Sequence, residues 1–211
     1  LELRSAIYRE AEDRPAFDVT RRGFQVSVQR NWESLAAWLV YDYRIVDLTQ
    51  VDERADIPRE SQNARVASLA PTFLYDRRDD PIDPRRGWSA NGQVEFASPV
   101  FDATADFVKL FGQATGVLDL RRWGTLAASG RVGAIHNRKP SDEPGLEPID
   151  QVPVAERFFA GGRTTHRAFA RDELGVPGET LLVNGREDVT PLGGGALLLG
   201  NFEWRFPIAG P

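Results

Sequence analysis

The chain has 211 residues, a formal net charge of -5, no cysteine, no methionine and two histidines. Without cysteine it holds neither a disulfide scaffold nor a thiolate metal site, and two histidines are too few for a histidine-rich metal site. The acidic balance argues against a nucleic-acid-binding surface, and the apolar runs are too short for a transmembrane helix.

Eight segments of the chain alternate between apolar and polar residues with a period of two, which is typical of β-strands. In the second segment, Phe24 and Val28 fall on one face, whereas Gln25 and Gln29 fall on the other. The pattern predicts an all-β fold. In chain order the segments are 1–10, 23–32, 35–45, 65–75, 89–98, 106–118, 124–135 and 196–206.

The length of these segments favours a membrane protein. They are about ten residues long, whereas ordinary strands average about five or six, and a tilted transmembrane strand needs about nine to eleven. Aromatic residues lie near strand ends on the apolar face, as in the aromatic girdles of outer-membrane barrels. We therefore predict an antiparallel transmembrane β-barrel segment, with a soluble β-sandwich as the alternative. The girdle residues are Trp32, Tyr43, Tyr75, Phe96, Trp204 and Phe206.

The connections between the segments also differ in length. Connections at 46–64 and 138–195 are long and rich in charged residues and proline, whereas those at 33–35 and 120–123 are short. Short turns on one rim and long loops on the other are typical of outer-membrane barrels. We expect one rim to hold 11–17, 46–64, 99–104 and 138–195, and the opposite rim to hold 33–35, 76–87 and 120–123.

Two stretches are more specific than this pattern. Residues 75–88 read YDRRDDPIDPRRGW, in which aspartate, proline and glycine favour a rigid turn. Residues 156–170 read ERFFAGGRTTHRAFA and place two glycines, three arginines and three phenylalanines in a predicted loop. The marked residues of the turn are Asp76, Arg78, Asp79, Pro81, Pro84 and Gly87.

With these two motifs and the strand GGGALLLGNFEWRFPI at 193–208, the chain resembles the bacterial outer-membrane assembly factors, the surface-antigen family that includes BamA and TamA. Two-partner secretion transporters and organelle homologues are related to this family. The first motif is similar to the family's YDxRDxPxxPxxG turn, and the second to its RFFAGG segment followed by V-R-G-F/Y. The family's barrel has sixteen strands and follows periplasmic POTRA domains.

The resemblance implies that residues 1–211 are one partial β-barrel domain, about strands 5 to 12, with a lumen-inserting loop at 138–195. POTRA domains and the last strands would be absent, which agrees with a chain that starts at Leu1 without an initiator methionine. The chain would then be a fragment of a longer protein.

The resemblance also implies a role for the loop, whose arginine is held by acidic groups on the lumen wall. Arg167 takes that position here, and Glu203, on the polar face of the last segment, is the candidate partner. The family usually has valine and glycine on either side of this arginine, where this chain has His166 and Ala168. The other predicted loop residues are Arg157 of the RFFAGG segment, Phe158, Phe159 and Phe169, which would anchor the loop tip by burial, and Gly161 and Gly162, which would let the loop turn.

The resemblance implies a non-enzymatic factor of the Gram-negative outer membrane that helps to insert or translocate other outer-membrane proteins, without a cofactor or metal. Its partners would be unfolded outer-membrane proteins, the lipid bilayer and, through missing domains, periplasmic or inner-membrane accessory proteins, but no nucleic acid. The alternatives are a two-partner-type secretion transporter of the same family and a plain outer-membrane barrel or porin. Acidic pairs such as Asp79 and Asp80 lie in predicted turns without an apolar pocket, which argues against an enzyme.

Overall fold

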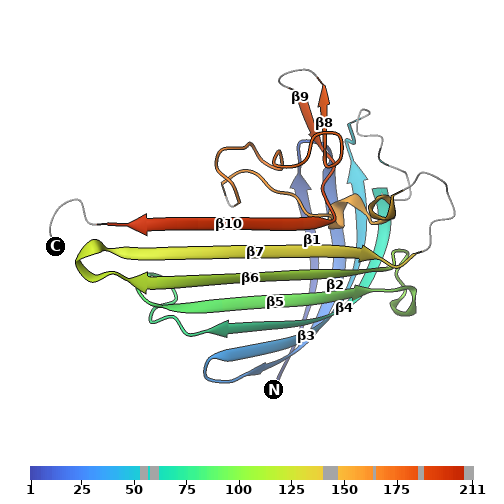
Figure 1. Ribbon diagram of the computed structural model, residues 1–211. Coiled ribbons are helices and arrows are strands. Elements are labelled where there is room, and N and C mark those ends of the chain that lie inside the picture. Colours follow the sequence, from blue (N-terminus) through green and yellow to red (C-terminus); the bar gives the residue numbers. More distant parts are fainter. Residues whose placement is uncertain (53–56, 58–61, 140–146, 164, 185–187, 207–211) are drawn as a thin grey trace.

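The computed structural model describes residues 1–52, 57, 62–139, 147–163, 165–184 and 188–206. Eight antiparallel strands form one curved sheet in chain order (Figure 1), which confirms the predicted all-β class. No helix in these ranges is long and apolar enough to cross a bilayer. The strands of the sheet are β1 (Glu2–Asp13), β2 (Asp18–Asn31), β3 (Leu35–Thr49), β4 (Asn63–Asp76), β5 (Gly87–Ala97), β6 (Phe107–Asp119), β7 (Thr125–Asn137) and β10 (Ala196–Arg205).

The long connection between β7 and β10 has structure of its own. It contains a separate two-stranded sheet, which the sequence pattern does not predict. Two short 3-10 helices also lie in this connection, and one lies in each of two other connections. These elements are β8 (Leu181–Asn184) and β9 (Asp188–Pro191), η4 (Pro148–Gln151) and η5 (Val154–Glu156) in the long connection, and η2 (Pro99–Phe101) and η3 (Arg121–Trp123) elsewhere.

All eight predicted strands are present, and most extend further than predicted. The longest, β3, has 15 residues, and the shortest of the sheet, β10, has 10. The extra residues lie mainly at the end where the long loops leave, because the ladder between β2 and β3 continues to the pair Asp18 and Thr49. There the inward side chains are covered by the loop between β7 and β10, so pairing continues beyond the alternating segments.

Burial across the sheet is inverted relative to a soluble protein. The predicted apolar face is exposed, with Phe24 at 42% and Phe202 at 70% exposure, whereas polar Ser27 and Gln29 on the opposite face are 8% and 7% exposed. The polar face lines the concave side of the sheet, and the apolar face points outward. This arrangement suits a sheet whose outer face meets lipid, and it confirms the faces predicted from the alternation.

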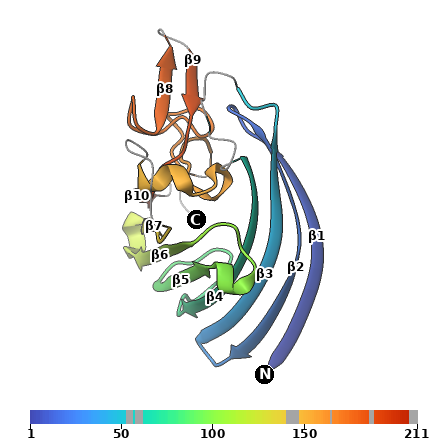
Figure 2. The same ribbon diagram turned by 90° about the vertical axis from the view of Figure 1, so that its right-hand side faces the viewer.

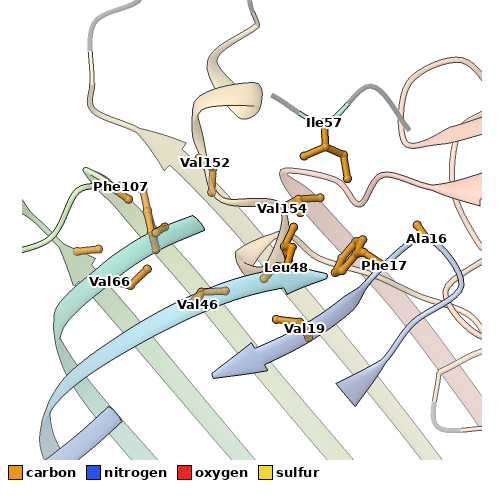
Figure 3. Close-up of a cluster of buried hydrophobic side chains, with 14 residues drawn as sticks. Ala16, Phe17, Val19, Val46, Leu48, Ile57, Val66, Phe107, Val152 and Val154 are labelled. Atoms are coloured by element: carbon orange, nitrogen blue, oxygen red, sulfur yellow. The ribbon is translucent and has the colours of Figure 1, made fainter. Parts of the chain in front are cut away.

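A hydrophobic core lies at one end of the concave side (Figure 3). There the strands turn Val19, Val46 and Val66 inward, and the loop between β7 and β10 adds Val152 and Val154. All five are at most 1% exposed. The core therefore joins the loop to the strand ends rather than filling the whole concavity.

The two rims are as predicted, with adjusted bounds. The connections 14–17, 50–62, 98–106 and 138–195 leave the rim that carries the core, and 32–34, 77–86 and 120–124 leave the other. Parts of 50–62 and 138–195 lie outside the described residues. One connection of the core rim, 14–17, is short, because β1 and β2 pair up to Asp13 and Asp18.

Candidate functional site: the loop between β7 and β10

The loop folds back over the concave face because its two ends are adjacent. β7 and β10 are hydrogen-bonded neighbours, with Ala134 opposite Ala196, so the chain leaves and returns at the same place. Two backbone hydrogen bonds, of 2.9 and 2.8 Å, join Phe158 and Gly194. Figure 2 shows the turns η4 and η5 on the concave side of the sheet. We call 148–162 the loop base, and residues 163 and 165–169 the loop tip.

A buried charge cluster holds the loop base to the sheet. The Arg44 guanidinium of β3 donates two hydrogen bonds to the Glu156 carboxylate, Nε to Oε1 at 3.1 Å and Nη2 to Oε2 at 2.8 Å. Arg44 Nη2 also lies 2.8 Å from Glu95 Oε1 on β5, which accepts a 2.8 Å hydrogen bond from Ser68 Oγ on β4. A guanidinium shared between two carboxylates forms strong, directional hydrogen bonds. Asp42, also on β3, forms a further ion pair with Arg44.

The backbone around Glu156 is held as well. Lys109 Nζ of β6 donates to the Glu156 carbonyl at 2.7 Å, and Arg21 Nη2 of β2 donates to the Ala155 carbonyl at 2.9 Å. Burial alone would raise the pKa of the Glu156 carboxyl, but Arg44 outweighs it and lowers that pKa to about 2. Glu156 is therefore charged at neutral pH, and strands β2, β3 and β6 all contact the same turn.

Phe158 and Phe159, which follow Glu156 and Arg157, make contacts at the loop base. The Phe158 ring covers Gly133 of β7, where a Cβ would lie 2.5 Å from the ring. Phe159 meets Phe17 edge-to-face at 6.0 Å and lies 4.4 Å beneath the Arg14 guanidinium. Both rings thus join the loop base to inward-facing groups of the sheet and its rim.

Arg157, the first residue of the RFFAGG segment, makes its contacts inside the loop. Its buried side chain donates to the carbonyls of Val152 and Leu192 at 3.3 and 3.4 Å, and it lies 3.5 Å from Asp150. Arg157 therefore ties the start of the loop base to the segment that leads into β10.

The glycine pair lies where the chain turns between base and tip. Gly161 and Gly162 have φ of 120° and 83°, in the region that favours glycine. A Cβ at Gly161 would lie 2.2 Å from the Ala170 carbonyl oxygen. Ala168 does not need that freedom: the described non-glycine residues with positive φ are Gln50, Asp102, Arg121 and Asp172. The alanine at this position is therefore accommodated without backbone strain.

The loop tip is much less enclosed. Arg167 and Glu203 line one open cleft of about 550 Å³ between the tip and the inner faces of β7 and β10. Within the described part of the chain no hydrogen bond or ion pair joins the two side chains. Glu203 instead accepts a 3.2 Å hydrogen bond from Arg205, and half of its side chain is exposed. The structure brings the predicted partners to one cleft without pairing them.

Phe169 does not anchor the tip by burial, so that expectation is wrong. Its side chain is 42% exposed, and its ring contact is with His166 of the same tip, edge-to-face at 5.1 Å. The physical reason is the open cleft: the residues opposite the tip, such as Ser129 and Asn201, are polar and form no apolar pocket.

Sequence reasoning missed Arg44, Glu95 and Glu156 as site residues. Arg44 and Glu95 both fall on the predicted polar faces of their strands, and Glu156 directly precedes the RFFAGG segment. Charged residues on an inward face, beside a motif expected to reach that face, were the available signal. No group of three or more possible metal ligands is present among the described residues.

The second predicted motif forms a closed, rigid turn on the opposite rim. Arg78 makes a two-pronged ion pair with Asp76, with Nη2 to Oδ2 at 2.6 Å. Asp79 Oδ1 accepts from the backbone N–H groups of Arg85 and Arg86 at 3.0 and 3.1 Å, which closes the turn. Gly87 has φ of 104°, as expected for its place in the motif. Pro81 and Pro84 lie in the part of the turn that Asp79 closes.

Comparisons with known proteins agree with this architecture. The chain is 27% identical over 198 residues to a SAM50-like protein of Schizosaccharomyces pombe, which covers 90% of this chain and 38% of that protein. The crystal structure of BamA from Haemophilus ducreyi lacking POTRA domains 1–3 matches with a TM-score of 0.74 at 18% identity, over 97% of this chain and 42% of that chain. The chain thus spans about two fifths of the length of these two proteins. The Omp85 superfamily domain matches residues 1–210, and the chain belongs to this superfamily.

Proposed function

We propose that this chain is part of an outer-membrane barrel that helps to insert or translocate other outer-membrane proteins. The observation that supports this proposal most strongly is the attachment of the loop base to the inner face of an Omp85 sheet by Arg44, Glu95 and Glu156. A buried ion cluster that spans a strand wall and a loop is costly to desolvate. We infer that this one is retained because it fixes a single arrangement of the loop. We take that arrangement to be the functional state of the loop.

In this proposal the chain works by geometry and not by chemistry. The anchored base holds the glycine pair in place, and the glycine pair directs the tip toward β7 and β10 at the inner wall. Client strands would be assembled elsewhere on the barrel by edge-to-edge pairing, while this wall and its loop keep the lumen shaped. Arg167 and Glu203 would pair when the cleft between them narrows.

The proposed location is the bacterial outer membrane, with the lipid bilayer and unfolded outer-membrane proteins as partners. The outward apolar face of the sheet supports the bilayer contact. Likeness to BamA supports a bacterial envelope, whereas likeness to a SAM50-like protein leaves an organelle location as the competing outcome. Accessory proteins would bind domains outside this chain.

Depletion of the full-length protein that carries this chain tests the function. The expected result is loss of heat-modifiable, folded forms of several unrelated outer-membrane barrels, with their unfolded forms accumulating in the periplasm. Complementation with Arg44→Ala should restore less folded protein than complementation with the matched variant Arg4→Ala, whose arginine lies exposed on β1. Loss of a single secreted protein, with all barrels folded, would instead establish a secretion transporter.

A further inference from the structure

The rim opposite the anchored loop, which we call the short-turn rim, has a composition of its own. It comprises the connections 32–34, 77–86 and 120–124, with the adjoining strand ends. In Figure 1, the turns that join β4 to β5 and β6 to β7 lie on this side, together with the end of β10. No apolar core forms there among the described residues, since the core cluster belongs to the other rim.

Tryptophan is concentrated at this rim. The chain has five tryptophans. Four of them lie at the rim with about half of each side chain exposed, and Trp38 lies nearby on the inner face, as the fourth residue of β3. Exposed tryptophans at strand ends are characteristic of the boundary between the acyl chains and headgroups of a bilayer. The four are Trp32, Trp88, Trp123 and Trp204.

Two of these indole rings make a cation–π contact with an arginine side chain. The Arg30 guanidinium lies 5.0 Å from the Trp32 ring centre, and the Arg122 guanidinium lies 5.3 Å from that of Trp123. Neither guanidinium has a hydrogen-bond or carboxylate partner within the described ranges. Trp204 supports the second pair, because its indole N–H donates to the Trp123 carbonyl at 2.8 Å. Each pair therefore presents an uncompensated cation beside an interfacial ring.

The acidic residues of this rim are already engaged, except Glu33, which makes no hydrogen bond or ion pair with the described residues. Asp76 pairs with Arg78, and the carboxylates of Asp79 and Asp80 accept backbone N–H groups of their own turn. The side chains of further rim arginines make no hydrogen bond or ion pair with the described residues. Those arginines are Arg77, Arg85, Arg86 and Arg121. The rim thus carries free guanidinium groups although its formal charges nearly balance.

At the opposite rim, arginine side chains form ion pairs with carboxylates. There Arg14 and Arg21 both contact Glu12, at 3.3 Å each, and Arg65 contacts Asp102 at 3.4 Å. Ion pairs within the protein compensate these cations. Free guanidinium groups beside exposed indoles are therefore a property of the short-turn rim and not of the arginines in general.

We propose that the short-turn rim binds the phosphate groups of anionic phospholipids, with Arg30 on Trp32 and Arg122 on Trp123 as two headgroup sites. The indole lies at the acyl-chain boundary, and the guanidinium stacked on it reaches the phosphate layer. A guanidinium fork matches a phosphate in two-pronged geometry, and each basic residue near an anionic surface strengthens binding by about fivefold. This inference depends on the membrane location of the sheet and not on its role in protein assembly.

The test uses the full-length protein in phosphatidylcholine nanodiscs that contain a minor fraction of phosphatidylglycerol. Native mass spectrometry counts the phosphatidylglycerol molecules retained after release from the disc. We expect enrichment of this lipid over phosphatidylcholine to fall about fivefold in Arg30→Gln and in Arg122→Gln, and further in the double variant. Added inorganic phosphate should leave the retained lipid unchanged, since the indole also requires an acyl chain.

The matched control is Arg22→Gln with Arg65→Gln, two exposed arginines that have carboxylate partners at the other rim. Their enrichment should equal that of the unmodified protein, and heat-modifiability verifies folding of every variant. Unchanged enrichment in the Arg30→Gln, Arg122→Gln double variant would overturn the proposal. An equal fall in the control would also overturn it. Absence of enrichment in the unmodified protein would overturn it as well and would point to an acidic protein partner for this rim.

Discussion

The base and the tip of the loop between β7 and β10 lie only a few residues apart, yet the sheet holds them in different ways. At the base, Glu156 is 5% exposed and bonded to an arginine that is 9% exposed. At the tip, Arg167 is exposed, and no described residue accepts from it. In this chain the loop is therefore fixed to the sheet by Glu156, the carboxylate before the motif, and not by Arg167, the arginine of the motif.

The difference has a physical origin in what each part faces. The base packs against the apolar core on one side, and Arg44, Glu95 and Glu156 are at most 9% exposed although they border a polar cleft of about 690 Å³. Electrostatic interactions between such buried groups are strong. The tip faces polar side chains across an open cleft, where an ion pair is worth little. The same pair of charges would therefore contribute differently at the two places.

The largest expected effect comes from removing the arginine at the centre of the base. Arg44→Met should lower the free energy of unfolding by about 3 to 5 kcal/mol, because it leaves Glu156 and Glu95 buried without their cation. The measurement is the temperature at which the full-length protein loses its heat-modifiable form. Arg4→Met, at an exposed ion pair of β1, is the control and should change little. Equal midpoints for the two variants would refute the central role of Arg44.

Acid should release the loop base from the sheet. Because the pKa of Glu156 in the folded protein, about 2, lies below its ordinary value of 4.5, its charge stabilises the anchored loop fully above about pH 4.5. That stabilisation is lost as the pH falls from 4.5 toward 2. Cleavage of the loop by an acid-stable protease should thus stay constant from neutral pH to about pH 5 and rise below it.

Glu156→Gln provides the control for this pH dependence. It should already show faster cleavage at neutral pH, and its cleavage rate should vary less between pH 5 and pH 2 than that of the unmodified protein. If both proteins show the same rise below pH 5, another carboxylate controls the loop.

A smaller effect concerns the packing of Phe158. Gly133→Ala should destabilise the protein by about 1 to 3 kcal/mol, because the new methyl group overlaps the Phe158 ring. In a Phe158→Ala background the same change should cost nearly nothing. The two unfolding midpoints, with and without Phe158, give the coupling directly. Independent, additive costs would mean that Phe158 does not rest on Gly133.

The smallest effect is expected at the tip. Arg167→Ala should change the free energy of unfolding by less than about 0.5 kcal/mol, the range for exposed substitutions. Thermal unfolding followed by heat-modifiability is again the measurement. A loss of several kcal/mol would show that Arg167 pairs with the wall in the native barrel, as the family resemblance implies.

The strand pattern could be predicted because it is local. Alternation along a strand assigns each side chain to one face, and the exposed Phe24 and the buried Gln29 are where parity places them. The same holds for Gly87 and Gly161, whose positive φ follows from the turns that surround them. Local rules of this kind require no knowledge of how distant segments meet.

The loop anchor could not be predicted in the same way. Arg44 and Glu156 are 112 residues apart, and their pairing depends on the path that the loop takes across the sheet. The apolar–polar alternation along the strands assigns Arg44, Glu95 and Glu203 to the inner face. It does not show which of them the loop contacts. The choice of Glu203 followed the resemblance, whereas the apolar strand ends near Arg44 draw the base toward the other rim.

The most direct test of this account compares two double-mutant cycles in the full-length protein. One combines Arg44→Met with Glu156→Gln, and the other combines Arg167→Met with Glu203→Gln, each read from thermal unfolding. The account predicts a coupling free energy of about 2 kcal/mol for the first pair and less than about 0.5 kcal/mol for the second. The reverse order would contradict it and would return the anchoring role to the arginine of the motif.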